Sequence, residues 1–103
     1  MAVSTIKTDY VPYTRLNNCI SYWRRNGVVG VKISTNNTSL NNNGVLIGTL
    51  PEGFRPPWQC DFAGTALGGS AVVFFRVESD GTIKGYASQS TVYWSGTFSF
   101  API

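Results

Sequence analysis

The sequence predicts an all-β fold, an antiparallel sandwich or barrel. Short runs of alternating apolar and polar residues recur along the chain, and no segment shows a helical period. Turn residues separate the runs every 8 to 12 positions or so, which gives about seven or eight strands, as in sandwiches and barrels. A length of 103 residues suits one domain with a modest core. We expect residues 1–12 to be a lead-in or linker and residues 13–103 to form a single domain.

The composition is that of a folded protein. Apolar residues make up 43% of the chain and charged residues only 13%, which argues against disorder. No apolar run is long enough to cross a bilayer, so we expect no membrane insertion. The N-terminus shows no basic segment followed by an apolar stretch, so we expect no signal peptide, and assembly in the cytoplasm fits.

The net charge and the two cysteines allow several partners. The charge of +3 permits an anionic partner such as teichoic acid or nucleic acid, but solubility explains it equally well. Cys19 and Cys60 are far apart and form no CxxC motif, so they indicate neither a disulfide framework nor a zinc site. We expect both to be buried free thiols, and their pairing stays open.

The first elements in chain order are a lead-in and a hairpin. Residues 13–16 form a weakly marked first strand. Residues 19–25 and 28–34 then form two strands joined by Asn26-Gly27, the strongest short hairpin signal. A two-residue loop places Trp23 opposite Gly30. The expected core face carries Ile20, Tyr22, Val29, Val31 and Ile33, and the outer face carries Trp23, Arg25, Lys32 and Ser34.

An asparagine-rich polar loop leads to the segment that marks the chain most clearly, residues 44–57. Its apolar run, residues 45–47, predicts a buried strand. Pro51-Glu52-Gly53 predicts a turn, because proline restricts its own φ and glycine supplies a positive φ. We expect Phe54 to return to the core and Arg55 to point outward. The two prolines that follow favour extended chain.

The second half of the chain predicts four further strands. Residues 58–65 alternate, and residues 71–79 are apolar on both faces, as in a central strand. Asp80-Gly81 closes a hairpin onto residues 82–88, and residues 92–100 form the last strand. We expect the aromatic side chains on the apolar faces to be core residues: Trp58, Phe62, Trp94, Phe98 and Phe100.

The residues show no assembled catalytic site. Histidine is absent, which removes the commonest general base, the usual serine triad and most zinc sites. Asp61 and Glu78 are carboxylates that could meet in space as a glycosidase pair does, but nothing in the sequence requires it. Glu52 and Asp80 lie in predicted turns. We therefore expect no enzyme activity, no metal and no cofactor.

The candidate contact residues are aromatic and basic. Trp23 is predicted on a polar face beside Arg25 and Lys32, where it would contact either another subunit or a ligand. We favour the subunit contact there. Tyr86 and Tyr93 are weaker candidates of the same kind. Arg24, Arg25 and Lys32 also suit a single-strand nucleic-acid platform, but the basic residues are few, and we expect no nucleic-acid partner.

Three segments resemble the C-terminal domain of tail-fibre and receptor-binding proteins of bacteriophages, especially phages of Gram-positive bacteria. The first is GTLPEGFRPP at residues 48–57. An apolar strand follows it, and then the second segment, VESDGTI at residues 77–83. A hairpin similar to YWRRNGVV at residues 22–29 commonly precedes them in that family. The resemblance covers roughly residues 19–101, and LPEGFRP is its most specific part.

The resemblance implies a jelly-roll-like antiparallel β-sandwich that forms homotrimers at a fibre tip. It implies a virion protein, made in the host cytoplasm, with an upstream fibre or baseplate protein and a host cell-wall or surface glycan as partners. The family shares no catalytic residues, so the LPEGFRP segment carries over as a structural signature. Three copies on one fibre would add avidity to weak single sites.

Three other functions stay open. The first alternative is a trimerisation or capping domain of a fibre that binds no ligand of its own. A carbohydrate-binding module of an enzyme comes next, followed by a nucleic-acid-binding β-barrel. Trimer formation is expected for the fibre-tip and capping functions and not for the others.

Overall fold

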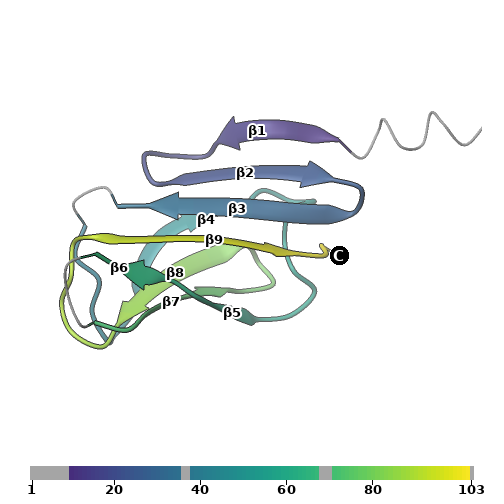
Figure 1. Cartoon of the computed structure of the whole chain (residues 1–103). Coiled ribbons are helices and arrows are strands. Elements are labelled where there is room, and N and C mark those ends of the chain that lie inside the picture. The colour runs from purple at the N-terminus through teal and green to yellow at the C-terminus, as the bar shows by residue number, and fades with distance from the viewer. Residues whose placement is uncertain (1–9, 36–37, 68–70, 103) are drawn as a thin grey trace, which may run out of the picture.

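The chain folds into two antiparallel β-sheets packed face to face (Figure 1). The computed structural model describes residues 10–35, 38–67 and 71–102. The predicted lead-in, residues 1–12, lies mostly outside these residues. Its last two positions, Val11 and Pro12, belong to the first strand, which therefore begins earlier than predicted.

Among the described residues, nine strands make up the two sheets, slightly more than predicted, because the strand expected at residues 58–65 is divided into Cys60–Ala63 and Thr65–Ala66. The five-stranded sheet has the order β1 (Val11–Arg15), β2 (Ile20–Arg25), β3 (Val28–Ser34), β9 (Trp94–Phe100) and β6 (Thr65–Ala66). The four-stranded sheet has the order β4 (Val45–Thr49), β8 (Thr82–Ala87), β7 (Val73–Val77) and β5 (Cys60–Ala63).

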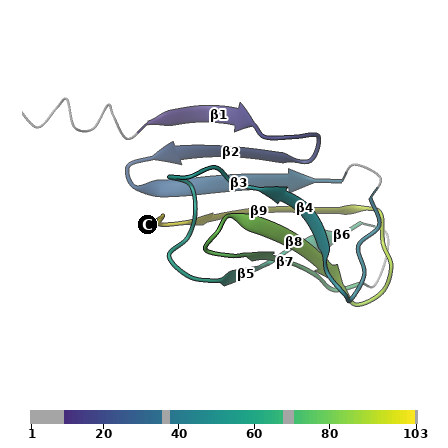
Figure 2. The same ribbon diagram turned by 180° about the vertical axis from the view of Figure 1, so that it is seen from behind.

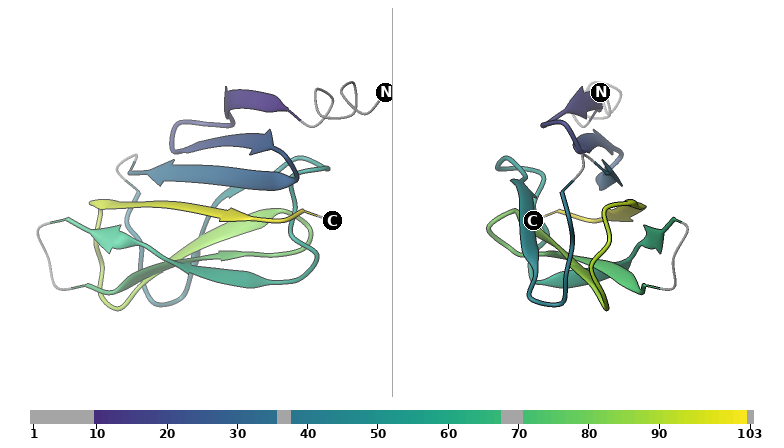
Figure 3. Two further views of the ribbon diagram at one scale, coloured as in Figure 1. Left: turned by 45° about the vertical axis from the view of Figure 1, so that its right-hand side comes forward. Right: turned by 90° about the vertical axis from the view of Figure 1, so that its left-hand side faces the viewer.

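The strand pairing is nested in the way of a jelly roll. β3 pairs with β9 in one sheet. β4 and β8, which lie between these two strands in the sequence, pair with each other in the other sheet. From behind, β4 and β8 lie in front of the five-stranded sheet (Figure 2). Seen along the strands, β1 and β2 extend beyond the edge of the four-stranded sheet (Figure 3). The fold is thus a jelly-roll-like sandwich and not a closed barrel.

The predicted hairpin is confirmed in its turn and in its register. Asn26 and Gly27 have φ values of 52° and 79°, as a type I′ turn requires. Trp23 pairs with Gly30, and Tyr22 pairs with Val31. The core face of the hairpin is therefore the predicted one.

The segment after β4 also forms the predicted turn, with one correction. The Phe54 N–H donates to the Pro51 carbonyl at 3.1 Å, and Gly53 has a φ of 91°. The Phe54 ring packs edge-on against Tyr22 at 4.7 Å and is partly buried. Arg55 does not point outward as predicted: it is half-buried, because its Nε–H donates to the Leu50 carbonyl at 2.9 Å.

The core between the sheets is apolar, and within the described residues it holds no buried polar side chain. Phe75 and Trp94 are its largest fully buried side chains. Its buried members are Cys19, Ile20, Val29, Val31, Ile33, Leu40, Ile47, Leu50, Val73, Phe75, Val77, Ile83, Ala87, Trp94 and Phe98.

Three burial predictions were wrong, each because of strand ends or edges. Trp58 is 71% exposed, because β5 begins two residues later and Trp58 is outside its alternation. Leu46 is 59% exposed, because only one face of the edge strand β4 meets the core. Cys19 and Cys60 are both free thiols, but only Cys19 is buried, and burial raises its pKa.

We expect Phe75→Ala to lower the free energy of unfolding by about 3–5 kcal/mol, because a large cavity would form between the sheets. Chemical denaturation at one fixed protein concentration measures this. Leu67→Ala is the control: its side chain is exposed, and the expected change is within about 0.5 kcal/mol. Equal effects of the two substitutions would contradict this description of the core.

Candidate functional site

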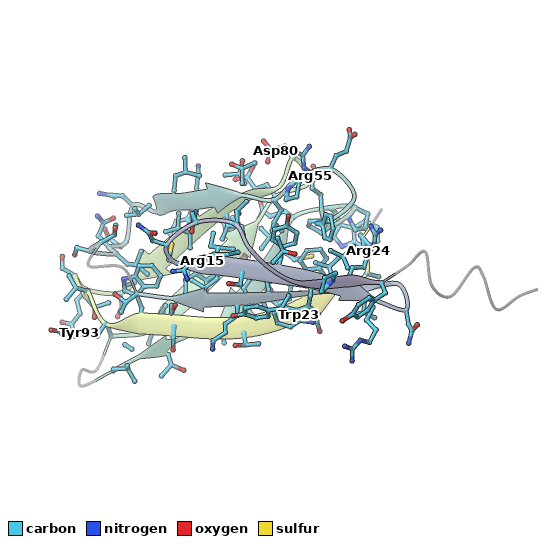
Figure 4. The ribbon with its side chains drawn as sticks, turned by 90° about the horizontal axis from the view of Figure 1, so that it is seen from above. Arg15, Trp23, Arg24, Arg55, Asp80 and Tyr93 are labelled. Atoms are coloured by element: carbon cyan, nitrogen blue, oxygen red, sulfur yellow. The ribbon has the colours of Figure 1, made fainter. Side chains whose placement is uncertain are left out.

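The structure distributes the predicted contact residues over two opposite faces and one end. Trp23, Arg25 and Lys32 lie on the outer face of the five-stranded sheet, as the hairpin register predicted. Tyr86 lies on the outer face of the four-stranded sheet, where it pairs with Phe74 of β7. Tyr93 precedes β9, is 59% exposed and lies at the far end of the molecule from Trp23 (Figure 4). These five residues therefore do not form one site.

On the outer face of the five-stranded sheet, the indole of Trp23 lies between two neighbours. On β3 it covers Gly30 so closely that a Cβ there would be 2.1 Å from the indole Cε2. On β1 the Tyr13 ring stacks on it at 5.6 Å with an interplanar angle of 21°. Trp23 is therefore half-buried, and Tyr13, at 61% exposure, is the more open ring.

Tyr13 was missed as a contact residue because its position depends on an irregular strand. The pairing of β1 with β2 shifts register between Val11 and Thr14, so sequence alternation alone does not give the neighbour of Tyr13. The Arg25 guanidinium lies 5.3 Å from the Tyr10 ring centre. A shallow cavity of about 230 Å³ lies here, lined by Tyr10, Val11, Pro12, Tyr13, Trp23 and Arg25.

Arg24 does not join this surface. Its side chain turns to the other side of β2, where Nη1–H donates to the Gly53 carbonyl at 2.8 Å. Its guanidinium lies 4.9 Å from the Phe54 ring centre. Figure 4 shows Arg24 and Trp23 on opposite sides of β2. The three cations suggested for a nucleic-acid platform are therefore divided between two sides of the sheet.

The outer face of the four-stranded sheet carries a similar arrangement. Tyr86 of β8 covers Gly44, where a Cβ would be 2.6 Å from the phenol ring. On its other side the Phe74 ring of β7 stacks nearly parallel to it at 4.7 Å. Phe74 was missed because residues 71–79 are apolar on both faces, so alternation does not show which side is outside.

Arg76 and Asp61 form an ion pair beside these rings. Arg76 Nε and Nη2 donate to the two carboxylate oxygens of Asp61 at 2.9 and 3.1 Å. The Arg76 guanidinium also lies 5.2 Å from the Tyr86 ring centre and 5.7 Å from that of Phe74. The hydrogen bonds from Arg76 lower the pKa of Asp61. Asp61 therefore stays ionised near neutral pH and is bonded to Arg76, not to Glu78.

A cavity of about 350 Å³ opens over the two rings. It combines flat aromatic surface with amide, hydroxyl and guanidinium groups, and its charged group is neutralised by Asp61. Its lining consists of Asn42, Val72, Phe74, Arg76, Tyr86, Ala87 and Ser88. Apolar walls with a few polar groups are typical of small-ligand sites.

In the part of the chain that the structure describes, no group of three or more His, Cys, Asp or Glu residues is placed to hold a metal ion. No helix among residues 10–35, 38–67 and 71–102 is long and apolar enough to cross a membrane.

Neither the family models nor the curated proteins match this chain. The two outer faces of the sandwich are the candidate binding surfaces. One has stacked rings beside cations, and the other has stacked rings beside a neutral ion pair.

We expect Arg76→Gln to raise the pKa of Asp61 toward its ordinary value, because the hydrogen bonds that lower it would be lost. Since the folded-state pKa is lowered, the stability from this pair is present above the unfolded-state pKa. It is lost as pH falls through the folded-state pKa. An NMR titration of the Asp61 carboxyl carbon measures the shift. Lys84→Gln, which removes a neighbouring cation, is the control, and in this variant the pKa of Asp61 should stay low. An unchanged pKa in Arg76→Gln would contradict the assignment.

Proposed function

We propose that this chain is a tip domain of a phage tail fibre that recognises a host cell-surface carbohydrate as a homotrimer. The observation that carries the binding role is the cavity over Phe74 and Tyr86. The assignment to a fibre rests on the resemblance of residues 48–57 and 77–83 to tip domains. In this proposal the domain belongs to the virion and joins an upstream fibre or baseplate protein.

The chemistry of the cavity suits a saccharide ring. The apolar C–H face of a sugar packs on an aromatic ring, and its hydroxyls need donors and acceptors at the ring edge. Asn42, Ser88 and Arg76 provide such groups beside Phe74 and Tyr86. Asp61 neutralises the positive charge of Arg76. The cavity lining therefore carries no unpaired charge, which suits an uncharged sugar.

A role in assembly without a ligand is the second candidate, and exposed apolar side chains favour it. Trp58 is the most exposed of the large apolar residues, and Trp is enriched at the centres of protein interfaces. Tyr93 and Val72 are also exposed. A homotrimer would bury some of these side chains whether or not a glycan binds.

We expect the chain to elute as a trimer, with a mass three times the 11.2 kDa of one chain. Size exclusion with light scattering measures this mass. Trp58→Ala and Trp23→Ala, measured in the same way, show whether either indole lies in the interface. A monomer at all accessible concentrations would contradict the trimeric part of the proposal.

We expect a glycan array to show binding of an uncharged cell-surface oligosaccharide, and Tyr86→Ala to weaken it about tenfold or more, the equivalent of one lost ring contact of about 1.4 kcal/mol. Tyr86→Phe keeps the ring and should retain most of the affinity. Leu46→Ala is the matched control, an exposed apolar residue on the same sheet that does not line the cavity. A trimer that binds no glycan would instead support the capping role.

A further inference from the structure

Three outward-facing residues form one row across β1, β2 and β3. Arg15 pairs with Ser21, and Ser21 pairs with Lys32. Because neighbouring strands are about 4.8 Å apart, the two cationic residues start about 10 Å apart with a hydroxyl between them. A cavity of about 120 Å³ lies at this row, and Ser34 and Asn18 add further polar groups to its lining.

The charge on this face is of one sign. Arg15, Arg25 and Lys32 all lie on the outer side of the five-stranded sheet. The acidic residues that the structure describes all belong to the four-stranded sheet or to turns that follow its strands; they are Glu52, Asp61, Glu78 and Asp80. Among the described residues no carboxylate competes with an anion for the three cations.

The stacked rings lie between the cations. Outward positions on β2 are Ser21, Trp23 and Arg25, and alternate residues of a strand are about 6.6 Å apart. The Arg15–Ser21–Lys32 row and Arg25 are therefore separated by about 13 Å, with Trp23 and its partner Tyr13 between them. The order along the strand is cation, aromatic ring, cation.

We propose that this face, the outer side of β1–β3, is a second binding site that takes a phosphate-bearing sugar or polyol chain. Phosphodiester oxygens bind at the Arg15–Ser21–Lys32 row and at Arg25, and the uncharged unit between them lies against Tyr13. The inference goes beyond the proposed glycan cavity and does not depend on it, since the two sites lie on opposite sheets.

Two other occupants fit the face less well. Single-strand nucleic-acid platforms stack successive bases on several open rings. Here Trp23 lies between Gly30 and Tyr13, so the exposed rings are Tyr13 and Tyr10, and the Arg25 guanidinium already lies over Tyr10. A second copy of the same face would bring like charges together, which opposes association.

The test is an NMR titration of the full chain with a synthetic oligo(glycerol phosphate) and, separately, with a neutral glucose oligomer of equal length. The phosphate oligomer should shift the amide signals of Arg15, Ser21 and Lys32. These shifts should become smaller as salt is added, because salt screens the charges. Arg15→Gln/Lys32→Gln should weaken its affinity at least tenfold. Lys84→Gln, one cation removed from the opposite sheet, should change it less than twofold.

Four binding results would overturn the inference. They are no shift on β1–β3 with the phosphate oligomer, equal shifts with the neutral oligomer, equal losses of affinity in Lys84→Gln and the double variant, and tighter binding of an oligo(dT) of equal charge. A changed solution mass of the double variant would assign the face to a subunit contact and overturn it as well. Unshifted signals from β4, β7 and β8 show that the double variant is folded. The glycan array and Tyr86→Ala test the other sheet, so the two proposals fail separately.

Discussion

The packing of Phe75 between the sheets is the contact on which the rest of the structure depends. Phe75 comes from the middle of the four-stranded sheet and is fully buried against the aromatic side chains of β9, with ring centres 6.1 Å from Trp94 and 6.4 Å from Phe98. Gly96 makes room for it, since a Cβ there would be 2.7 Å from the ring. Because strands alternate, the residues that meet here determine which of their neighbours face outward. The chemistry of both outer faces follows from this core.

The two outer faces are built alike but differ in charge. In each, a large ring covers a glycine that lies on, or directly before, one neighbouring strand, and it stacks on an aromatic ring from the other neighbouring strand. These sets are Gly30, Trp23 and Tyr13 on one sheet and Gly44, Tyr86 and Phe74 on the other. The first set lies among cations, whereas the second lies beside an arginine that Asp61 neutralises. The ligands that we propose differ accordingly, with a neutral sugar ring on one side and a chain with negative charge on the other.

Two carboxylates, Asp61 and Asp80, are held by hydrogen bonds within the fold. The pKa of Asp61 is lowered by Arg76, and the pKa of Asp80 is lowered by the N–H of Thr82, which donates to it at 2.9 Å. A general acid needs the opposite shift, toward neutral pH. The function that we propose depends on stacking, hydrogen bonds and charge, and several copies on one particle would strengthen weak single sites.

The sequence by itself determined the all-β class, the Asn26-Gly27 hairpin with its register, the turn at residues 51–53 and the outward position of Trp23. Each of these depends on local rules, namely turn dihedrals and the alternation of side chains along a strand. Only the tertiary structure decided that Trp58 is exposed, that Arg55 folds back onto Leu50, and that Tyr13 and Phe74 complete the two ring platforms. These features depend on where a strand begins, on a register shift in β1 and on which side of β7 meets the other sheet. Turn dihedrals and alternation along a single strand do not specify these features, because each depends on the neighbouring strand or on the folded path of the chain.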